Sequence, residues 1–440
     1  MKFSRDDNVK QLVVEFQNGK FSKCEKEAIY LLEHYKDDYF LYNFLGLCQY
    51  KLKKFSQSIN TYKSAIKIKK DYPEALNNLG SSLIEIGELE EAKECFVKAI
   101  NIKPDYLVSL NNLAGTYYDL AEYDSALNSY NNVLKINPKF PEVEDNILRI
   151  LTFFDPKNSN LNNITKTNFL LKNVKLKINL DEKIENNELF NFYKKCNLIL
   201  KKNYKIDNFK LSQAWRRNKI DLNCKRHFQV FWGTNAIPKY CFECYKLQFT
   251  LRTVTDLIKL YFLFDNINLK NNNIRKCFVE MRSIAKGVYK GLIYCKGIEE
   301  AQEIKKIIEP KVISFFNNKV IIKFKRGCTE FGEAHPNFKE INKQSINFMN
   351  YPEEWEIKES LIDKNIPPKN RLNSKILTDS LNGININDFL TIKNWIIYAK
   401  LIGDNSYTNF DADIEISEFM KKEMQDQIEN KNNEFKEINS

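Results

Sequence analysis

Glycine and proline are scarce in this chain, with 13 and 11 among 440 residues, and histidine occurs only three times. So few turn-forming residues argue against an all-β protein, whose many short strands need Gly- and Pro-rich turns. The sequence also contains no Gly-rich phosphate loop, no G-x-S-x-G elbow and no H-E-x-x-H pair, which are local signatures of nucleotide-binding proteins, serine hydrolases and zinc proteases. These absences favour a helical or mixed architecture and leave the question of an enzymatic activity open.

Long apolar runs are missing too. The most apolar run, residues 257–264, is interrupted by Lys259 and falls well short of the roughly 18 apolar residues of a membrane helix. The charged residues after Met1 are followed by no apolar stretch, so we expect no signal peptide. The sequence therefore predicts a cytoplasmic protein without a membrane span, whose ten cysteines are thiols or metal ligands rather than disulfides.

The net charge of +11 comes mainly from lysines that are spread over the whole chain. Basic charge favours anionic partners in general, but charge without a pattern does not indicate a nucleic-acid interface, so nucleic acid is not the expected main partner. Hydrophobic residues make up 43% of the chain. That is enough for sizeable cores in two or three domains.

A period of 34 residues organises the first third of the sequence. Leu-Gly, Leu-Gly and Leu-Ala stand at 45–46, 79–80 and 113–114, and aromatic, alanine and proline positions recur in the same frame. Each unit has the pattern of two amphipathic helices, which cannot bury an apolar face alone, so neighbouring units must stack. The pattern resembles the tetratricopeptide repeat (TPR) over about residues 5–140, with three full units after a weaker one. The resemblance implies an α-helical solenoid.

Repeat proteins of this family line a concave groove with the first helix of each unit. In this chain, asparagines occupy the fifth and sixth positions of these helices, at Asn43, Asn77, Asn78, Asn111 and Asn112. Asparagine side chains can both donate and accept hydrogen bonds along an extended backbone. The resemblance therefore implies a protein or peptide partner in the groove. The alternative is that these asparagines only reflect an Asn-rich composition.

The sequence changes character after the repeats. We predict four segments: the TPR array with a capping helix at 1–154, a linker at 155–187, a cysteine-rich α+β domain at 188–405, and a charged tail, helical or frayed, at 406–440. Within the third segment, alternating apolar residues predict strands at 277–282, 289–295 and 320–325, with a helix at 297–308 between the last two. This β-β-α-β order predicts a smaller α/β or α+β domain, like half of a ferredoxin-like fold.

The second half also resembles, in segments 235–242 and 393–395, domains linked to TPR arrays in environmental bacteria. No activity and no residue roles follow from that resemblance. Trp215, in the basic segment 214–219, either stacks on a base or anchors a surface helix. Glu280 and Arg282 alternate on a predicted strand and either line a pocket or face water.

Cysteine spacing is the feature of the second half that points to chemistry. Cys224 and His227 form a C-x2-H pair, and Cys241 and Cys244 form a C-x2-C pair. Two-residue spacers allow paired side chains to bind one tetrahedral zinc ion. The first pair lies shortly before the second in the chain, which makes a shared metal site a hypothesis worth carrying forward.

Three further cysteines enter through strand pairing. If the first two predicted strands form a hairpin centred on Lys286, Cys277 lies opposite Cys295, and a right-handed crossover brings Cys328 to the same sheet edge. The candidate ligands of zinc or an iron–sulfur cluster are then Cys224, His227, Cys241, Cys244, Cys277, Cys295 and Cys328. The alternatives are ordinary buried thiols or a reactive thiol, for example in a dyad of Cys328 with His335.

Two functional hypotheses follow from the sequence. The first is an interaction or scaffold protein that binds an extended peptide or partner protein in the concave TPR groove. The second is an enzyme or metal protein that recruits its substrate through the array and carries its chemistry at the cysteine cluster.

Overall fold

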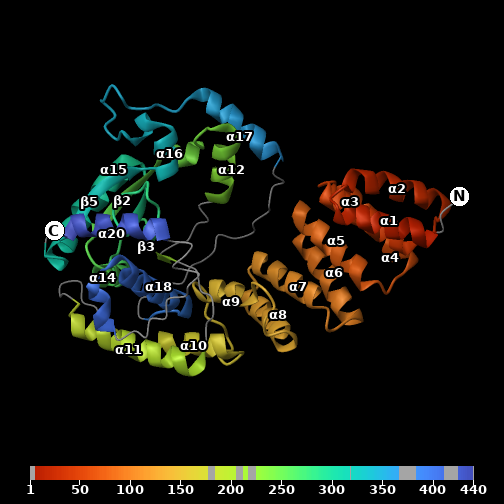
Figure 1. Ribbon diagram of the computed structural model, residues 1–440, viewed down its shortest axis with the longest axis horizontal. Helices are drawn as coiled ribbons and strands as arrows, with labels where there is room; N and C mark the ends of the chain where they lie inside the picture. Colours follow the sequence, from red (N-terminus) through yellow and green to blue (C-terminus); the bar gives the residue numbers. More distant parts are fainter. Residues whose placement is uncertain are drawn as a thin grey trace. The chain divides into compact units, whose positions relative to one another are not determined.

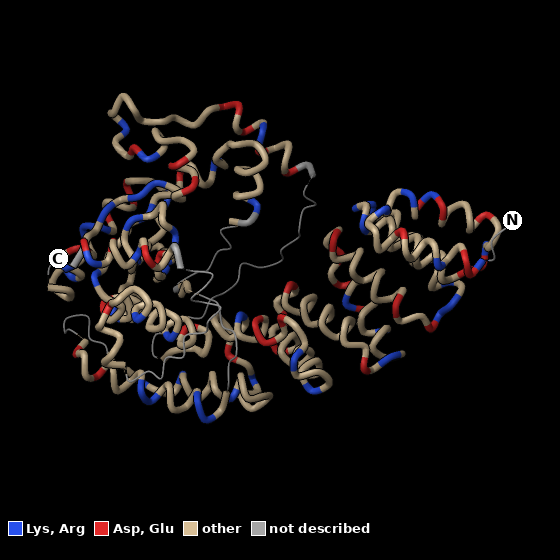
Figure 2. Tube along the Cα trace, viewed as in Figure 1, with Lys and Arg blue, Asp and Glu red and all other residues tan. Residues whose placement is uncertain are grey.

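The computed structural model describes residues 5–176, 184–204, 212–216, 224–317, 319–365, 383–410 and 425–439. They form two compact units, one made of the described residues up to Ile147 and one of those from Leu148 onward (Figure 1). None of the described helices is both long and apolar enough to cross a membrane. Basic and acidic residues are interspersed along the trace of each unit (Figure 2).

The first unit is a stack of helical hairpins, coloured red to orange in Figure 1. Its helices are α1 (Arg5–Gln17), α2 (Phe21–His34), α3 (Tyr39–Lys51), α4 (Phe55–Ile68), α5 (Pro73–Ile86), α6 (Leu89–Ile102), α7 (Leu107–Asp119) and α8 (Tyr123–Ile136). Each helix packs against the next, and the first helices of neighbouring hairpins, α3, α5 and α7, also touch. The predicted α-solenoid is therefore confirmed, and α9 (Val143–Leu151) follows it.

Close approach of the two helices in each hairpin explains the glycines of the 34-residue period. A Cβ atom added to Gly46 would lie 2.5 Å from the Tyr62 ring, and one added to Gly80 would lie 2.7 Å from the Phe96 ring. Both rings are buried. Because a packed interior leaves a ring little room to move aside, this position requires a very small residue.

The turns between the two helices of each hairpin share a left-handed backbone. The residues concerned are 34 positions apart and have φ angles of 75°, 60°, 89° and 62°, at Gly19, Lys53, Gly87 and Ala121. A left-handed residue is a common way to end a helix. Gly19 falls in the same frame as the other three, so the weak first unit is built like the full repeats.

Replacing Gly80 with alanine should lower the free energy of unfolding of the array by about 1–3 kcal/mol, because the new methyl group would overlap the Phe96 ring. Gly115 on α7 is the matched control, since nothing lies within 4 Å of a Cβ added there. Gly115→Ala should be neutral or stabilise by up to about 1 kcal/mol through helix propensity. Urea unfolding followed by circular dichroism measures both variants. Equal stabilities would contradict the close-approach explanation.

The second unit is built on a five-stranded sheet. Its strands are β1 (Gln213–Arg216), β2 (Cys244–Leu251), β3 (Arg275–Val279), β4 (Tyr289–Lys296) and β5 (Ile321–Arg326). They lie in the order β1-β3-β4-β2-β5, and every neighbouring pair is antiparallel. Helix α14 (Val254–Asn266) connects β2 to β3, and α15 (Gly297–Phe315) connects β4 to β5. The predicted β-β-α-β unit is confirmed, and β2 and α14 complete a ferredoxin-like β-α-β-β-α-β unit.

Helices α14 and α15 pack on one face of this sheet. Phe249 of β2 contacts Phe264 of α14, with ring centroids 5.4 Å apart. Gly291 of β4 pairs with Phe249, and a Cβ added there would lie 2.3 Å from Leu260 of α14. Since side chains alternate along a strand, the even-numbered residues of β2 point to the opposite face.

The remaining helices surround the sheet. They are α10 (Asn163–Lys172), α11 (Asn186–Asn203), α12 (Cys224–Thr234), α13 (Lys239–Phe242), α16 (Thr329–Ala334), α17 (Glu353–Asn365), α18 (Ile386–Ile402) and α20 (Gln425–Asn439), with short 3-10 turns at Pro336–Lys339 and Asn405–Phe410. α18 is tied to α14 by the Tyr261 hydroxyl, which donates to Asp388 at 2.7 Å. Phe231, Phe242 and Phe331 belong to an aromatic cluster that joins α12, α13 and α16.

Two segments differ from their predicted structure. The linker contains α10, because Asn162 and Thr165 form a reciprocal capping box that nucleates a helix in an otherwise polar stretch. The described part of the basic segment, residues 214–216, belongs to β1 rather than to a surface helix, and its remaining residues lie outside the described ranges. The charged tail, predicted as helical or frayed, is helical in α20, where Lys431 is buried and donates to the Ala285 carbonyl at 2.6 Å.

Candidate functional site

The asparagines of the predicted ladder bond mainly to one another. The Asn78 amide donates to Asn43 Oδ1 at 3.0 Å, and the Asn112 amide donates to Asn77 Oδ1 at 3.0 Å. The Ser109 hydroxyl donates to Asn77 Oδ1 as well, also at 3.0 Å. Asn43 and Asn77 are buried. The ladder therefore ties each repeat to the next, a role that the sequence pattern did not reveal.

Asn111 is different from the other members of the ladder. Its Oδ1 atom is buried and has no hydrogen-bond partner among the described residues. Asn43 and Asn77 each accept from a residue 35 positions further along, and the corresponding residue for Asn111 is Asn146, for which no such bond forms. A buried acceptor without a donor costs about 1–3 kcal/mol.

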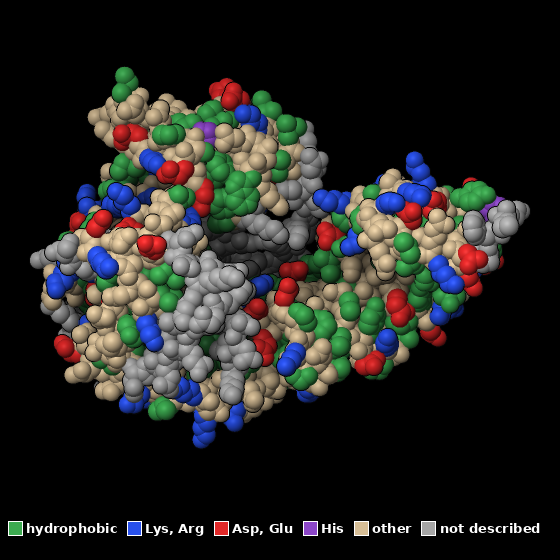
Figure 3. Space-filling view, in the orientation of Figure 1, with side chains coloured by type: hydrophobic (Ala, Val, Ile, Leu, Met, Phe, Trp, Pro, Cys, Tyr) green, Lys and Arg blue, Asp and Glu red, His purple; other side chains and the backbone are tan. Residues whose placement is uncertain are grey.

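The surface around these helices is mixed in charge. On the face drawn in Figure 3, basic, acidic and hydrophobic side chains alternate over the repeats. At the interface of α3 with α5, the Tyr50 hydroxyl donates to Glu85 Oε1 at 3.4 Å. No single sign of charge predominates on the face drawn in Figure 3.

The hairpin of β3 and β4, which was predicted to bring Cys277 and Cys295 together, has a different register from the predicted one. Cys277 lies opposite Gly291 rather than Cys295, and Cys295 lies opposite Tyr245 of β2. Both cysteines are on the side of the sheet that the helices cover, so the prediction that they face each other is wrong. The observed pairs centre the connection between β3 and β4, residues 280–288, on residue 284, two residues before the predicted centre at Lys286. The length of this connection cannot be read from strand alternation.

The other four predicted cysteines gather at one end of the sheet. Cys244 begins β2, and its carbonyl accepts from the Gly327 N–H at 2.7 Å, which sets Cys328 beside it. Cys241 lies on the short helix α13 before β2, and Cys224 begins α12. Burial raises the pKa of the Cys224 and Cys241 thiols, and the nearby Cys328 sulfur raises both further.

As they lie, the described His, Cys, Asp and Glu side chains form no group of three or more that could hold a metal ion. His227 is buried, and its Nδ1 atom has no hydrogen-bond partner within the described ranges. Burial lowers the pKa of this imidazole. The two members of the predicted dyad have separate contacts, since His335 Nε2 lies 3.0 Å from the Asn235 carbonyl and Cys328 Sγ lies 3.4 Å from the Lys246 ammonium.

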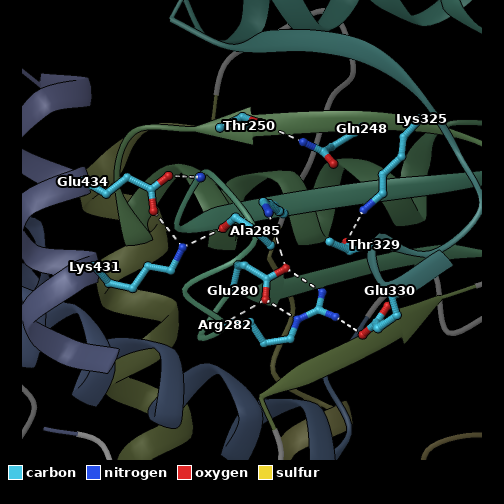
Figure 4. A network of polar contacts seen from close by, with 12 residues as sticks. Gln248, Thr250, Glu280, Arg282, Ala285, Lys325, Thr329, Glu330, Lys431 and Glu434 are labelled. Carbon is cyan, nitrogen blue, oxygen red and sulfur yellow. Dashed lines mark hydrogen bonds and ion pairs between the residues drawn. The ribbon is translucent and has the colours of Figure 1, made fainter. Parts of the chain in front are cut away.

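The face of the sheet opposite α14 and α15 carries a cluster of polar side chains, which we call the polar face. By strand register its polar members include Trp215, Lys246, Gln248, Thr250, Lys276, Lys290, Tyr294, Lys323 and Lys325. Figure 4 shows part of it, with Gln248 and Thr250 of β2 and Lys325 of β5. Lys246 and Lys290 are only 4% and 3% exposed, whereas Lys276 and Lys325 are partly exposed and Lys323 is exposed. The middle of this face is therefore enclosed, and its β5 edge is open to solvent.

One buried carboxylate anchors the polar face. Glu280, just after β3, accepts from Arg282 Nε and Nη2 at 2.8 Å each and from the Lys290 ammonium at 3.3 Å (Figure 4). Arg282 also pairs with Glu330 of α16. Burial acts to raise the pKa of Glu280, but the hydrogen bonds from Arg282 and the charge of Lys290 lower it to about 2. Of the two alternatives for this pair, Glu280 is buried, whereas the Arg282 side chain is 43% exposed and meets both Glu280 and solvent.

Three lysines of the polar face have unusually low pKa values. Burial, reinforced by neighbouring cations, lowers the pKa of Lys276 and of Lys325 to about 8. Burial also lowers the pKa of Lys290 to about 8, although Glu280 opposes the shift. Lys325 donates to the Thr329 hydroxyl at 2.6 Å. Lys276 instead lies over aromatic rings, 4.8 Å from the centroid of Trp215.

These lysines are the functional candidates that sequence reasoning missed. A signal was present in the alternation of β2, where Lys246, Gln248 and Thr250 stand between large apolar residues. The same alternation occurs at Lys323 and Lys325 of β5. Polar residues at every second position normally indicate a solvated face, which is why their burial could not be expected.

Lys276→Met should stabilise the second unit by about 2 kcal/mol at pH 7, because the folded chain holds this ammonium at a pKa of about 8 against 10.5 normally. The folded lysine loses its proton before the unfolded one does, so the advantage of the variant is present below pH 8 and should vanish as the pH rises toward 10.5.

Urea unfolding of the parent protein and of Lys276→Met at pH 7, 8.5 and 10 measures the difference in their free energies of unfolding. The titration of all other groups is common to both proteins and cancels in this difference. Lys306→Met on α15 removes an exposed lysine and is the matched control. A gap between Lys276→Met and the parent that does not depend on pH would contradict the assignment.

Two repeat-family models match the first unit of the chain. One, described as "Tetratricopeptide repeat", matches residues 71–139, and the other, described as "TPR repeat", matches residues 46–84. Both lie within the helical hairpins α3 to α8. The first unit is thus a tetratricopeptide-repeat array. No curated protein matches the chain.

Parts of several solved structures are similar to part of this chain. MamA is 19% identical over 34% of this chain and 84% of that chain, with a TM-score of 0.31. YrrB, described as a TPR protein with an unusual peptide-binding site, is 18% identical over 32% of this chain and 72% of that chain, with a TM-score of 0.30. The first TPR of Spaghetti (RPAP3), bound to an HSP90 peptide, is 17% identical over 26% of this chain and 89% of that chain, with a TM-score of 0.25. Similarity at this level assigns neither a partner nor an activity to this chain.

Proposed function

We propose that the tetratricopeptide-repeat array binds an extended segment of a partner protein along the first helices α3, α5 and α7. Arrays of this kind present one continuous concave surface because each repeat rotates slightly against the next. Neighbouring first helices of this array touch, α3 with α5 and α5 with α7, and they carry the in-register asparagines. A protein-interaction role is the coarse function that the repeats support, and the extended peptide is its specific form here.

The observation that supports the proposal most is the side-chain oxygen of Asn111, which accepts no hydrogen bond from the described residues. Its Oδ1 atom is buried without a partner in the described part of the chain, while its side chain remains partly exposed. An extended peptide offers a backbone N–H every second residue on one side. One such N–H at Asn111 would satisfy the acceptor and fix the register of the bound segment.

Asn111→Ala should weaken binding of an extended peptide about tenfold, as expected for one lost hydrogen bond to a buried acceptor. The full chain first selects binders from a displayed random-peptide library, and calorimetry then measures the dissociation constant of the best peptide for each variant. Asn60→Ala on α4 and Asn132→Ala on α8 are the controls, since both asparagines are exposed on second helices. If the controls weaken binding as much as Asn111→Ala, or if no peptide is selected, the groove proposal fails.

A second candidate function concerns metal binding by the thiols at the start of β2 and just after the end of β5. Cys224, Cys241, Cys244 and Cys328 are the four of the seven predicted ligands that share this location. Four thiolates are a common ligand set for structural zinc. All ten cysteines are free thiols, which accords with the cytoplasmic location that we propose. Because the thiols form no ligand group as they lie, a metal ion would have to draw them together.

The metal proposal predicts about one zinc or iron-cluster equivalent per purified chain, measured by elemental analysis of the full-length protein. Cys241→Ser with Cys244→Ser should abolish the bound metal, since two ligands are lost together. Cys48→Ser with Cys95→Ser, which changes two buried thiols of the array, should leave the metal content unchanged. A metal content at background in the parent protein would end the proposal.

A further inference from the structure

The polar face holds more positive than negative charge. Five lysines of the face are described, at Lys246, Lys276, Lys290, Lys323 and Lys325, and Arg282 lies beside it. The carboxylates that pair with Lys290 and Arg282 are Glu280 and Glu330. Lys431 of α20 is also near, but it is neutralised by Glu434 at 2.7 Å. Positive charge therefore accumulates on this face, and Lys246 and Lys290 carry it in the enclosed middle.

The excess is concentrated on the lysines that lack a carboxylate. Lys246 donates to the Gly327 carbonyl at 2.8 Å and to Cys328 Sγ at 3.4 Å. Lys325 donates to a hydroxyl. Lys276 makes no hydrogen bond or ion pair with any residue that the structure describes and lies between the Trp215 and Phe278 rings. Buried like charges destabilise a fold unless an opposite charge is supplied.

The arrangement is suited to a small anion with several charges. Lys276, Lys290 and Lys325 come from three different strands, and Gln248 of the central strand lies between them in register. The strands of Lys276 and Lys325, β3 and β5, are separated by β4 and β2, so three spacings of about 4.8 Å, or about 14 Å, lie between their backbones. The long lysine side chains must therefore extend over β4 and β2 to contact one anion. Lysine acts as a point charge toward phosphate oxygens. The strands hold these cations in place before any ligand arrives.

We propose that the polar face binds a small, multiply charged anion of the phosphate class, with Lys276, Lys290 and Lys325 as its charged contacts and Gln248 and Thr250 as hydrogen-bond donors. Enclosure favours a small molecule over a nucleic acid. A nucleic-acid surface presents its lysines to solvent along a groove, whereas Lys290 is 3% exposed here. The proposal concerns the second unit and is independent of the function proposed for the array.

Calorimetric titration of the full-length protein with inorganic pyrophosphate tests this site, after its metal content has been determined. We expect saturable binding that weakens at least tenfold in Lys276→Met with Lys325→Met, since methionine keeps the length of the side chain and removes the charge. Lys306→Met with Lys311→Met, on exposed positions of α15, changes the net charge by the same amount and should bind as the parent does. Circular dichroism verifies that each double variant is folded.

Three further titrations sharpen the outcome. Adenosine triphosphate that binds more tightly than pyrophosphate, with the same loss in the double variant, would place a nucleotide at the site, whereas citrate of equal affinity would place a polycarboxylate there and overturn the phosphate class. A single-stranded RNA oligonucleotide that binds more tightly than pyrophosphate would overturn the small-molecule proposal. Absence of pyrophosphate binding in the parent, or equal weakening in both double variants, would overturn the site itself.

Discussion

The antiparallel pairing of β2 with both β4 and β5 is the constraint on which the second unit depends. It puts β2 inside the sheet, so alternate residues of one strand must suit two different surroundings. Phe249 packs under α14, while Lys246 and Gln248 point to the other side. The sheet is therefore apolar on one face and charged on the other. Because the middle of that charged face is enclosed, the buried Lys246 and Lys290 repel neighbouring cations more strongly than solvated lysines would.

The thiols and the lysines of the second unit meet at Cys328. Its sulfur lies 3.4 Å from the ammonium of Lys246, which also donates to the carbonyl of Gly327. A thiolate at this place would neutralise Lys246, whereas Lys290 has its own partner in Glu280. A metal site and an anion site would therefore be neighbours with different charges, and the occupancy of one would alter the electrostatic potential at the other.

The sequence was most informative where structure depends on local, repeated contacts. The repeat frame predicted the solenoid because each hairpin meets only its neighbours, but the bond from Asn78 to Asn43 depends on how repeats stack, which no single unit encodes. In the second unit, the C-x2-C spacing of Cys241 and Cys244 was interpreted as a pair of metal ligands. The start of the central strand β2 at Cys244 was therefore not predicted. The predicted partner of Cys277 was also wrong, because alternation along a strand does not fix which residue of the neighbouring strand lies opposite. The three missed lysines carry no local mark of burial.

The asparagine ladder makes the array resemble a one-dimensional lattice with a repeating bond. Each unit supplies an acceptor for the unit that follows, so a copy inserted between two existing units would find the same bond on both of its sides. The lattice has unequal ends. At the beginning, Phe44 stands where the following units have an asparagine donor, and at the other end Asn111 is an unsaturated terminal site. An added unit would supply a donor to Asn111, but its own asparagine would then be the acceptor without a partner. The number of repeats would therefore set the position of the unpaired acceptor along the solenoid.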